Sequence, residues 1–202
     1  MITITLQQIE AHNPCVSGWT KVLRANGGAN ADRTQPFALA SVLDSNDLAD
    51  TLWCLRCLPE YDAVWRLYAV WCARQVQRLM ADQRSIRALN VATDYALGQA
   101  TRTELAAAVD AAYAARTDAA RTDAAYAAAD AADAADAYAA DAADATAAYA
   151  AAAAAYAAAD ADAADATRTA ADADARKKQA DMIRRVLNAD APLAEIKAAL
   201  NV

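Results

Sequence analysis

The sequence predicts an all-α protein. The chain of 202 residues contains only four Gly and four Pro, so few positions would interrupt a helix. Alanine, which has the highest helix propensity of all residues, makes up 43 of the 72 residues from 104 to 175. Capping signals also precede several segments whose apolar residues recur at helical spacing. These observations predict an N-terminal helical bundle over residues 1–100 and an Ala-rich helical arm over residues 101–202.

Capping residues mark the first two helices of the bundle. Thr5 and Gln8 have the spacing of a capping box, and the helix that they begin should stop at Asn13-Pro14. Ser17 is the expected cap of the second helix. That helix should end at Asn26-Gly27-Gly28, because glycine readily adopts the left-handed conformation that follows a helix.

Two further helices are predicted before residue 60. Pro36 is expected in the first turn of a helix over 36–43, a position at which its missing N–H group costs nothing. The string DSND at 44–47 then supplies an N-terminal cap for a helix that Pro59 ends.

The segment from 60 to 80 shows a helical apolar stripe, with Arg66 and Arg74 directed to another side. The residues of the stripe are Val64, Tyr68, Trp71, Cys72 and Leu79. Another helix is expected from 83 to 97, ended by Gly98. All four Trp and the single Phe precede residue 72, so we expect the main hydrophobic core in the bundle.

The arm begins with a second capping box, Thr101 to Glu104, and contains neither Gly nor Pro up to about residue 187. On a helical wheel its acidic residues share one arc, namely Asp118, Asp123, Asp130, Asp133, Asp136, Asp141 and Asp144. Tyr138, Tyr149 and Tyr156 align on a different side. A short closing helix is expected near 191–200, with Asp190 as its cap and Pro192 in its first turn.

The arm is expected to pack through its Ala and Tyr face, with Asp facing water. Alanine buries little area, so such a face gains stability only where another helix approaches closely. Either the arm folds back as a hairpin near 116–122 or 144–146, or it pairs with a second copy in a homodimer. The residues alone leave both arrangements open, because neither turn candidate contains Gly, Asn or Pro.

Charge and cysteine content predict a soluble, cytoplasmic protein that does not contact a membrane. The net charge of −7 is concentrated in the arm, since residues 104–175 carry −11 and the two flanking regions carry +1 and +3. No span approaches the roughly 20 apolar residues that cross a bilayer, and the first residues lack a secretion signal. Four cysteines in a chain of this length favour reduced thiols.

Several segments together resemble the alanine-rich immunity-protein-like family of bacteria and their phages. They are HNPCVSGWTKVL (12–23), LDSNDLADTLWCLRCLPE (43–60), RLYAVWCARQV (66–76) and RSIRALNVATDYALGQATRTELAAA (84–108), followed by the Ala-rich tail. The resemblance covers nearly the whole chain but supplies no catalytic residues. It implies a role in conflict between phage and host, or between toxin and antitoxin.

Enzymatic chemistry has the weakest support in the sequence, and no cofactor is predicted. The chain has no Walker loop, no GxGxxG and no HExxH motif, and its one histidine, His12, has no nucleophile signature nearby. Cys54 and Cys57, with His12 and Cys15, have the residue types of a zinc site. We favour packing for this cysteine pair, because it falls inside an amphipathic helix.

The acidic stripe of the arm suggests a nucleic-acid mimic as one alternative. Seven Asp between 118 and 144 give one charge per about 6.5 Å of helix, whereas a DNA strand carries one per about 3.4 Å. The charge density of one stripe is too low to mimic DNA, although two adjacent helices would come close to the charge density of a DNA strand. The alternative is that a mostly Ala helix needs Asp on its outer face to remain soluble.

An Arg and Trp set predicts the ligand class, because a guanidinium beside an indole can pair a phosphate and stack a base. The predicted ligand-binding residues are Trp53, Arg56, Trp65, Arg66, Trp71, Arg74, Tyr138 and Tyr149. An Ala-lined helix would leave room for the ligand. The predicted function is a non-enzymatic phage counter-defence protein that sequesters a small anionic host molecule such as a nucleotide immune signal, without binding nucleic acid directly. The alternatives are an acidic protein-binding inhibitor and an immunity or structural partner without a ligand.

Overall fold

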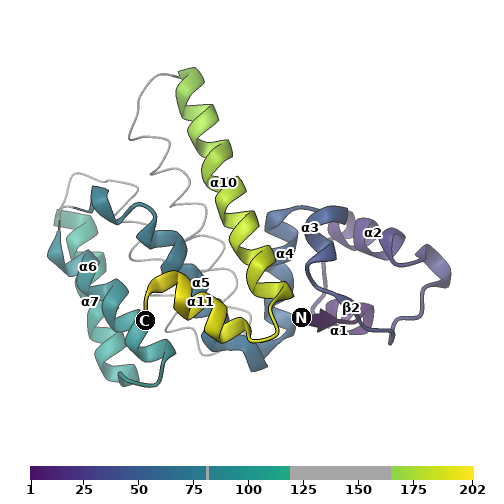
Figure 1. The fold of residues 1–202 in the computed structure, drawn as a ribbon, viewed down its shortest axis with the longest axis horizontal. Helices are drawn as coiled ribbons and strands as arrows, with labels where there is room; N and C mark the ends of the chain where they lie inside the picture. The colour runs from purple at the N-terminus through teal and green to yellow at the C-terminus, as the bar shows by residue number, and fades with distance from the viewer. Residues whose placement is uncertain (81, 119–164) are drawn as a thin grey trace.

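The computed structural model describes residues 1–80, 82–118 and 165–202 and confirms an all-α fold (Figure 1). Its α-helices are α1 (Leu6–Ala11), α2 (Val16–Ala25), α3 (Ser41–Ser45), α4 (Leu48–Cys54), α5 (Asp62–Arg74), α6 (Gln83–Ala96), α7 (Arg102–Asp118), α10 (Asp165–Asn188) and α11 (Pro192–Leu200). Short 3-10 helices are η1 (Gly28–Asn30), η2 (Leu55–Cys57), η3 (Pro59–Tyr61) and η4 (Gln77–Leu79), and the two strands are β1 (Thr3–Ile4) and β2 (Phe37–Ala38).

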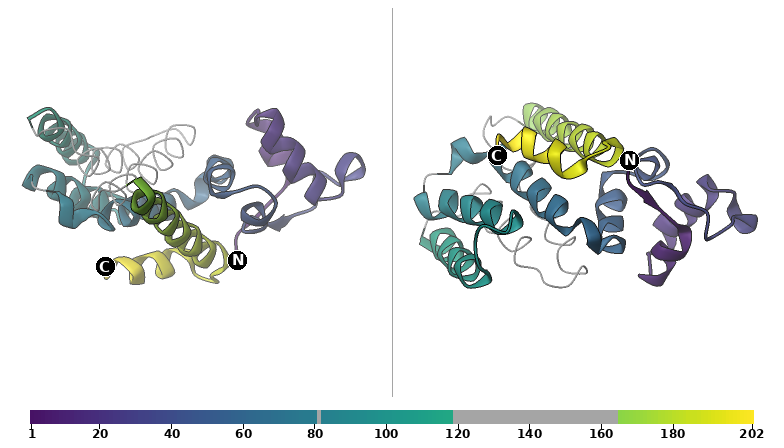
Figure 2. Two further views of the ribbon diagram at one scale, coloured as in Figure 1. Left: turned by 90° about the horizontal axis from the view of Figure 1, so that it is seen from above. Right: turned by 60° about the horizontal axis from the view of Figure 1, so that its bottom comes forward.

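The described helices are spread along one long axis (Figures 1 and 2). The N-terminal elements α1 and α2 lie at one end, and α6 and α7 lie side by side as a hairpin at the other. Helix α5 occupies the middle, where it packs against both α6 and α11. The position of α5 makes it the element that joins the two ends of the molecule.

Helix α5 is the centre of the hydrophobic core. Its residues Leu67, Tyr68, Ala69, Val70, Cys72 and Ala73 have no exposed surface. The hydroxyl of Tyr68 donates a hydrogen bond to the carbonyl of Gln179 at 3.1 Å, which ties α5 to α10. Met182, Ile183, Val186, Leu187 and Ile196 join the same cluster from α10 and α11. The main core therefore draws on the C-terminal helices as well as on the Trp-rich region where the sequence predicts it.

A second, smaller cluster lies between α5, α6 and α7. It consists of Val70, Ala88, Ala92, Leu105, Ala108, Val109 and Ala112. Four of these seven residues are Ala, so the helices gain dispersion contacts only where their backbones approach closely. An Ala face of α7 thus packs against α6 of the predicted bundle, a partner that neither of the two predicted arrangements of the arm includes.

The region around Pro36 differs from the prediction. Residues 37 and 38 form β2, which pairs antiparallel with β1, with Phe37 opposite Ile4 and Ala38 opposite Thr3. The following N–H, of Leu39, donates to the carbonyl of Ile2 at 3.1 Å, and the helix begins only at Ser41. Pairing with a distant segment satisfies the backbone groups of this stretch and buries Ile2, Ile4 and Leu39, so tertiary contacts override the local helix signal.

Most predicted helix ends are confirmed. Thr5 and Gln8 exchange both bonds of a capping box, and the side chain of Asp47 accepts from the N–H of Asp50 at 2.8 Å. Gly98 follows α6 with a φ of +73°, a conformation that glycine adopts without strain. Helix α2 differs, because it begins at Val16 with Cys15 as its cap in place of Ser17.

The predicted helix from 60 to 80 is interrupted. Helix α5 stops at Arg74 with Gln75 as its C-terminal cap, and the chain then turns into η4. Val76 and Met80 enter the core from this irregular segment, and their burial compensates for the helical bonds that are lost.

Part of the predicted arm lies outside the described residues. This applies to Tyr138, Tyr149, Tyr156 and all Asp residues from Asp123 to Asp144, and hence to the hairpin and homodimer alternatives. The described C-terminal part matches the prediction in outline, since α10 ends at Asn188 and Pro192 lies in the first turn of α11. Asp190 does not cap α11 and lies 3.9 Å from the Met1 ammonium group. Among the described helices, none has the length and apolar character needed to cross a membrane.

Candidate functional site

Two of the predicted ligand-binding residues, Trp53 and Arg56, form a pair. The guanidinium carbon of Arg56 lies 4.4 Å from the centroid of the Trp53 ring. Arg56 Nε also donates to the carbonyl of Trp53 at 3.2 Å, which holds the side chain in this position. The predicted cation–π arrangement of an Arg beside a Trp is therefore present at the end of α4.

Trp65 and Trp71 belong to the core or its edge. Trp65 is 2% exposed, and its indole Nε1 donates to the carbonyl of Leu58 at 3.1 Å. Trp71 is half-buried and stacks against Tyr68, with ring centroids 6.3 Å apart and an interplanar angle of 18°. Because Trp65 is buried and Trp71 stacks against Tyr68, the main role of both indole rings in the described structure is packing.

Arg66 is held by an acid and an aromatic ring. Its Nη2 lies 3.4 Å from a carboxylate oxygen of Asp62, one helical turn earlier, and its guanidinium carbon lies 5.3 Å from the ring centroid of Tyr95. Burial raises the pKa of Asp62, whereas the charge of Arg66 acts to lower it. The positive charge of Arg66 is thus largely matched within the protein.

Arg74 is a half-buried cation surrounded by neutral oxygens. Its guanidinium donates to Gln77 Oε1 at 3.2 Å, to Asn90 Oδ1 at 3.1 Å and to Thr93 Oγ1 at 3.4 Å. Burial lowers the pKa of Arg74, and the charge of Asp94 opposes this effect. Within the described residues, its buried Nε has no hydrogen-bond acceptor, and no carboxylate lies within ion-pair distance.

The three predicted arginines do not form one pocket in the described structure. Arg56 contacts Trp53, Arg66 contacts Asp62 and Tyr95, and Arg74 contacts the polar side chains of α6. Tyr138 and Tyr149, the remaining predicted ligand residues, lie outside the described residues.

A groove lies between α6 and α7. Its volume is about 410 Å³, which lies in the size range of small-molecule sites. One wall consists of Ala107, Ala108 and Ala111 of α7, whose small side chains leave the space open. The opposite wall, on α6, carries charged side chains. Because the hollow lies between the two helices of the α6–α7 hairpin, we call it the hairpin groove.

Two arginines occupy the start of α6 in the hairpin groove. Arg84 makes a two-pronged contact with Asp82, with distances of 2.7 to 3.2 Å, and these bonds lower the pKa of Asp82. Arg87 lies one turn later, is exposed, and makes no hydrogen bond or ion pair with any residue that the structure describes. Arg87 therefore presents an unmatched positive charge to the groove.

Two carboxylates occupy the other end of the hairpin groove, next to the turn that connects α6 and α7. Glu104 Oε2 accepts bonds from the N–H and the hydroxyl of Thr101, each at 2.8 Å, and these bonds lower the pKa of Glu104. Asp94 lines the groove beside Gln99. The groove thus has a cationic end and an acidic end.

Our sequence interpretation did not single out Arg84 and Arg87. The signal was available, since Arg-x-x-Arg in a predicted helix places two cations on one face, directly before a helix rich in Ala. The nearby Trp residues favoured the arginines of η2 and α5 instead.

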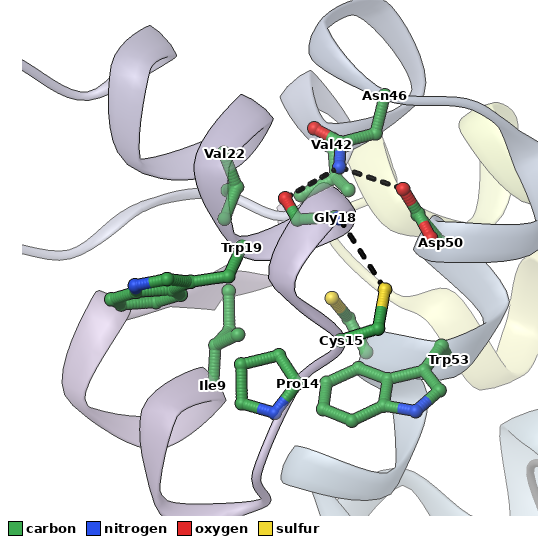
Figure 3. Close-up of a pocket in the computed structure, with 11 residues that line it drawn as sticks. Ile9, Pro14, Cys15, Gly18, Trp19, Val22, Val42, Asn46, Asp50 and Trp53 are labelled. Carbon is green, nitrogen blue, oxygen red and sulfur yellow. Dashed lines mark hydrogen bonds between the residues drawn. The ribbon is translucent and has the colours of Figure 1, made fainter. Parts of the chain in front are cut away.

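A small apolar pocket lies near the N-terminus, with a volume of about 80 Å³ (Figure 3). Ile9, Pro14, Trp19 and Trp53 line it together with the start of α2. Gly18 leaves little space there, because a methyl group at this position would lie 3.2 Å from both carboxylate oxygens of Asp50 and from the sulfur of Cys15.

Cys15 differs from the other three cysteines. Its exposed sulfur caps α2 and interacts with the Ser17 hydroxyl and the Gly18 N–H, contacts that lower the pKa of the thiol. Cys54, Cys57 and Cys72 are buried, and burial raises the pKa of Cys72 to about 12. His12 bonds through Nδ1 to the carbonyl of Gln8, and the described residues contain no group of three or more side chains suited to hold a metal.

No protein-family model, curated protein or solved structure matches this chain. The resemblance to the immunity-protein-like family stays a prediction.

Proposed function

We propose that this chain is a non-enzymatic binding protein that sequesters a small anionic, nucleotide-like molecule in the hairpin groove. The observation that carries the proposal is the exposed guanidinium of Arg87 in a hollow of about 410 Å³. A guanidinium pairs phosphate oxygens through two parallel N–H donors, which makes arginine well suited to phosphate recognition. The Ala wall of α7 provides the room for the rest of the ligand.

Arg74, at the end of α5, supports the same ligand class through its contacts with α6. Its charge has only neutral hydrogen-bond partners among the described residues, and Asp94, which lines the groove, is close enough to act on its pKa. Arg74 therefore offsets part of the negative charge of Asp94 and makes the groove less repulsive to an anion.

The biological setting in this proposal comes from the sequence resemblance. It is that of a phage counter-defence protein in the host cytoplasm that removes a host immune signal from solution. The homodimer in this proposal comes instead from the Ala face of the arm. Sequestration needs affinity and abundance but no catalytic group, which agrees with the absence of catalytic motifs in the sequence. The acidic inhibitor hypothesis rests on the Asp stripe, all of which except Asp118 lies outside the described residues, and it stays a prediction.

A thermal-shift assay tests the proposal, with ADP, cyclic dinucleotides and ADP-ribose as probes. A ligand at 100 times its Kd should stabilise the protein by about 2.7 kcal/mol. Arg87→Ala should remove most of this gain, because a hydrogen bond to a charged group contributes about 1.5–3 kcal/mol. Arg74→Ala should reduce it less, since Arg74 does not line the groove.

Arg24→Ala is the matched control, since Arg24 is an exposed cation on α2, away from the groove. It should leave the ligand-induced shift unchanged. An absence of any shift across the whole panel, or equal shifts in the wild type and Arg87→Ala, would contradict the proposal.

A further inference from the structure

The hairpin groove has two chemically different ends because of its topology. Helices α6 and α7 run antiparallel around the turn at 97–101, so Glu104 lies near Asp94 and Gln99, while Arg84 and Arg87 lie toward the open end of the hairpin. A ligand that fills the groove therefore meets guanidinium groups at one end and carboxylates at the other.

The two ends are separated by a defined length of helix. Arg87 and Asp94 are seven residues apart on α6, which corresponds to about 10 Å at 1.5 Å rise per residue. This separation is comparable to the Debye length of about 10 Å at 0.1 M salt, so the carboxylates repel an anion bound at Arg87 only weakly. The same distance requires a ligand with a second polar group well removed from its anionic group.

The acidic end offers hydrogen-bond acceptors with spare capacity. In the described structure the Asp94 carboxylate accepts no hydrogen bond, and Glu104 uses only Oε2, for its contacts with Thr101. Ionised carboxylates accept hydrogen bonds and cannot donate them, so this end suits a hydroxyl or an amine and not a second phosphate.

Gln99 favours hydroxyl groups over an amine at this end. It lines the groove beside Asp94, and its amide both donates and accepts hydrogen bonds. A hydroxyl can donate to a carboxylate and also accept from the Gln99 amide, whereas an ammonium group can only donate. Two neighbouring carboxylates can each accept from one hydroxyl of a vicinal diol. In dinucleotide-binding folds, a single Asp or Glu accepts from the ribose 2′-hydroxyl in this way.

From this arrangement we infer that the ligand is a phosphorylated ribose compound of the nucleoside diphosphate type. Arg87, with Arg84, binds the terminal phosphate, and Asp94 and Glu104 bind the 2′- and 3′-hydroxyls. The span between these groups in an extended nucleoside diphosphate is comparable to the helical distance between Arg87 and Asp94. The inference rests on the proposed function and specifies the ligand of the same site.

Isothermal titration calorimetry with ADP, 2′,3′-dideoxy-ADP and pyrophosphate tests the inference. The wild type should bind ADP at least about tenfold more tightly than dideoxy-ADP, because the dideoxy compound leaves two carboxylates without donors. Asp94→Asn and Glu104→Gln should each reduce the difference between the two affinities, because a neutral amide oxygen accepts a weaker hydrogen bond than a carboxylate does, while leaving pyrophosphate binding intact or stronger. Arg87→Ala should weaken the binding of all three probes.

Glu104→Gln is an informative variant because glutamine preserves the capping box at the start of α7. Far-UV circular dichroism and an unchanged melting temperature of the apoprotein would show that the variant is folded. Asp94→Asn keeps the shape of the side chain at an exposed position, so the same controls apply.

The outcomes separate the two proposals. If ADP and dideoxy-ADP bind the wild type equally well, the diol assignment is overturned and anion binding stands. The same conclusion follows if 2-aminoethyl phosphate binds more tightly than ADP. If neither ADP nor pyrophosphate binds, both the proposed function and the ligand assignment are overturned.

Discussion

Helices pack through large side chains around α5 but mainly through Ala side chains between α6 and α7. Around α5, large side chains such as Leu67 and Tyr68 fill the space between helices and are fully buried. Between α6 and α7, Ala88, Ala92 and Ala112 are equally buried, but each contributes only a methyl group to the contact.

The comparison shows what each kind of packing makes available for function. Large side chains close the space around α5, so the described cysteine and aromatic side chains there become part of the core. Methyl-sized side chains leave an open hollow wherever the backbones diverge, and the hairpin groove forms where the Ala wall of α7 faces the charged side of α6. The Ala-rich sequence thereby supplies both a packing surface and a ligand-sized space.

The largest expected effect is the loss of a large side chain beside α5. Leu67→Ala should lower the free energy of unfolding by about 2–5 kcal/mol, because it leaves a cavity in a site with no exposed surface. Urea unfolding followed by circular dichroism measures this change. Val16→Ala is the control, since Val16 is 83% exposed, and it should change stability by less than about 0.5 kcal/mol. Equal effects of the two variants would show that α5 is not the centre of the core.

An intermediate effect is expected from an enlarged side chain in the hairpin. Ala92→Leu should destabilise the protein by about 1–3 kcal/mol, because three extra carbon atoms force apart helices that meet at methyl groups. Ala107→Leu is matched to it, as Ala107 is exposed on the groove wall. It should leave the unfolding free energy nearly unchanged but weaken nucleotide binding. A stable Ala92→Leu variant would contradict close packing of α6 against its neighbours.

The smallest expected effect comes from the turn of the hairpin. Thr101→Ala removes the hydroxyl that accepts from the Glu104 N–H at 3.2 Å, and should cost about 1 kcal/mol in unfolding free energy. Thr103→Ala, two residues further along the exposed side of α7, should be neutral or slightly stabilising. The difference between the two melting temperatures measures the capping contribution, and an equal response would show that the box contributes nothing.

Local signals predicted the helix ends well. The boxes at Thr5 and Thr101, the cap at Asp47 and the stop at Gly98 were all predictable, because each depends on hydrogen bonds or backbone angles within a few residues. The all-α class followed from the same local preferences. Of the candidate site, sequence reasoning anticipated an Arg-bearing surface and an Ala wall, but it chose arginines of η2 and α5 in place of Arg84 and Arg87.

The remaining features were decided by contacts between residues distant in the chain. The pairing of Phe37 with Ile4 replaced a predicted helix, and Ile183 and Ile196 completed the core from the far end of the sequence. Trp65 became a core residue through its bond to Leu58 and the burial around it. The amino-acid sequence by itself determined where helices start and stop, because those energies are local. Only the tertiary structure decided which faces meet and where a hollow remains, because burial and charge matching depend on the packing of the whole chain.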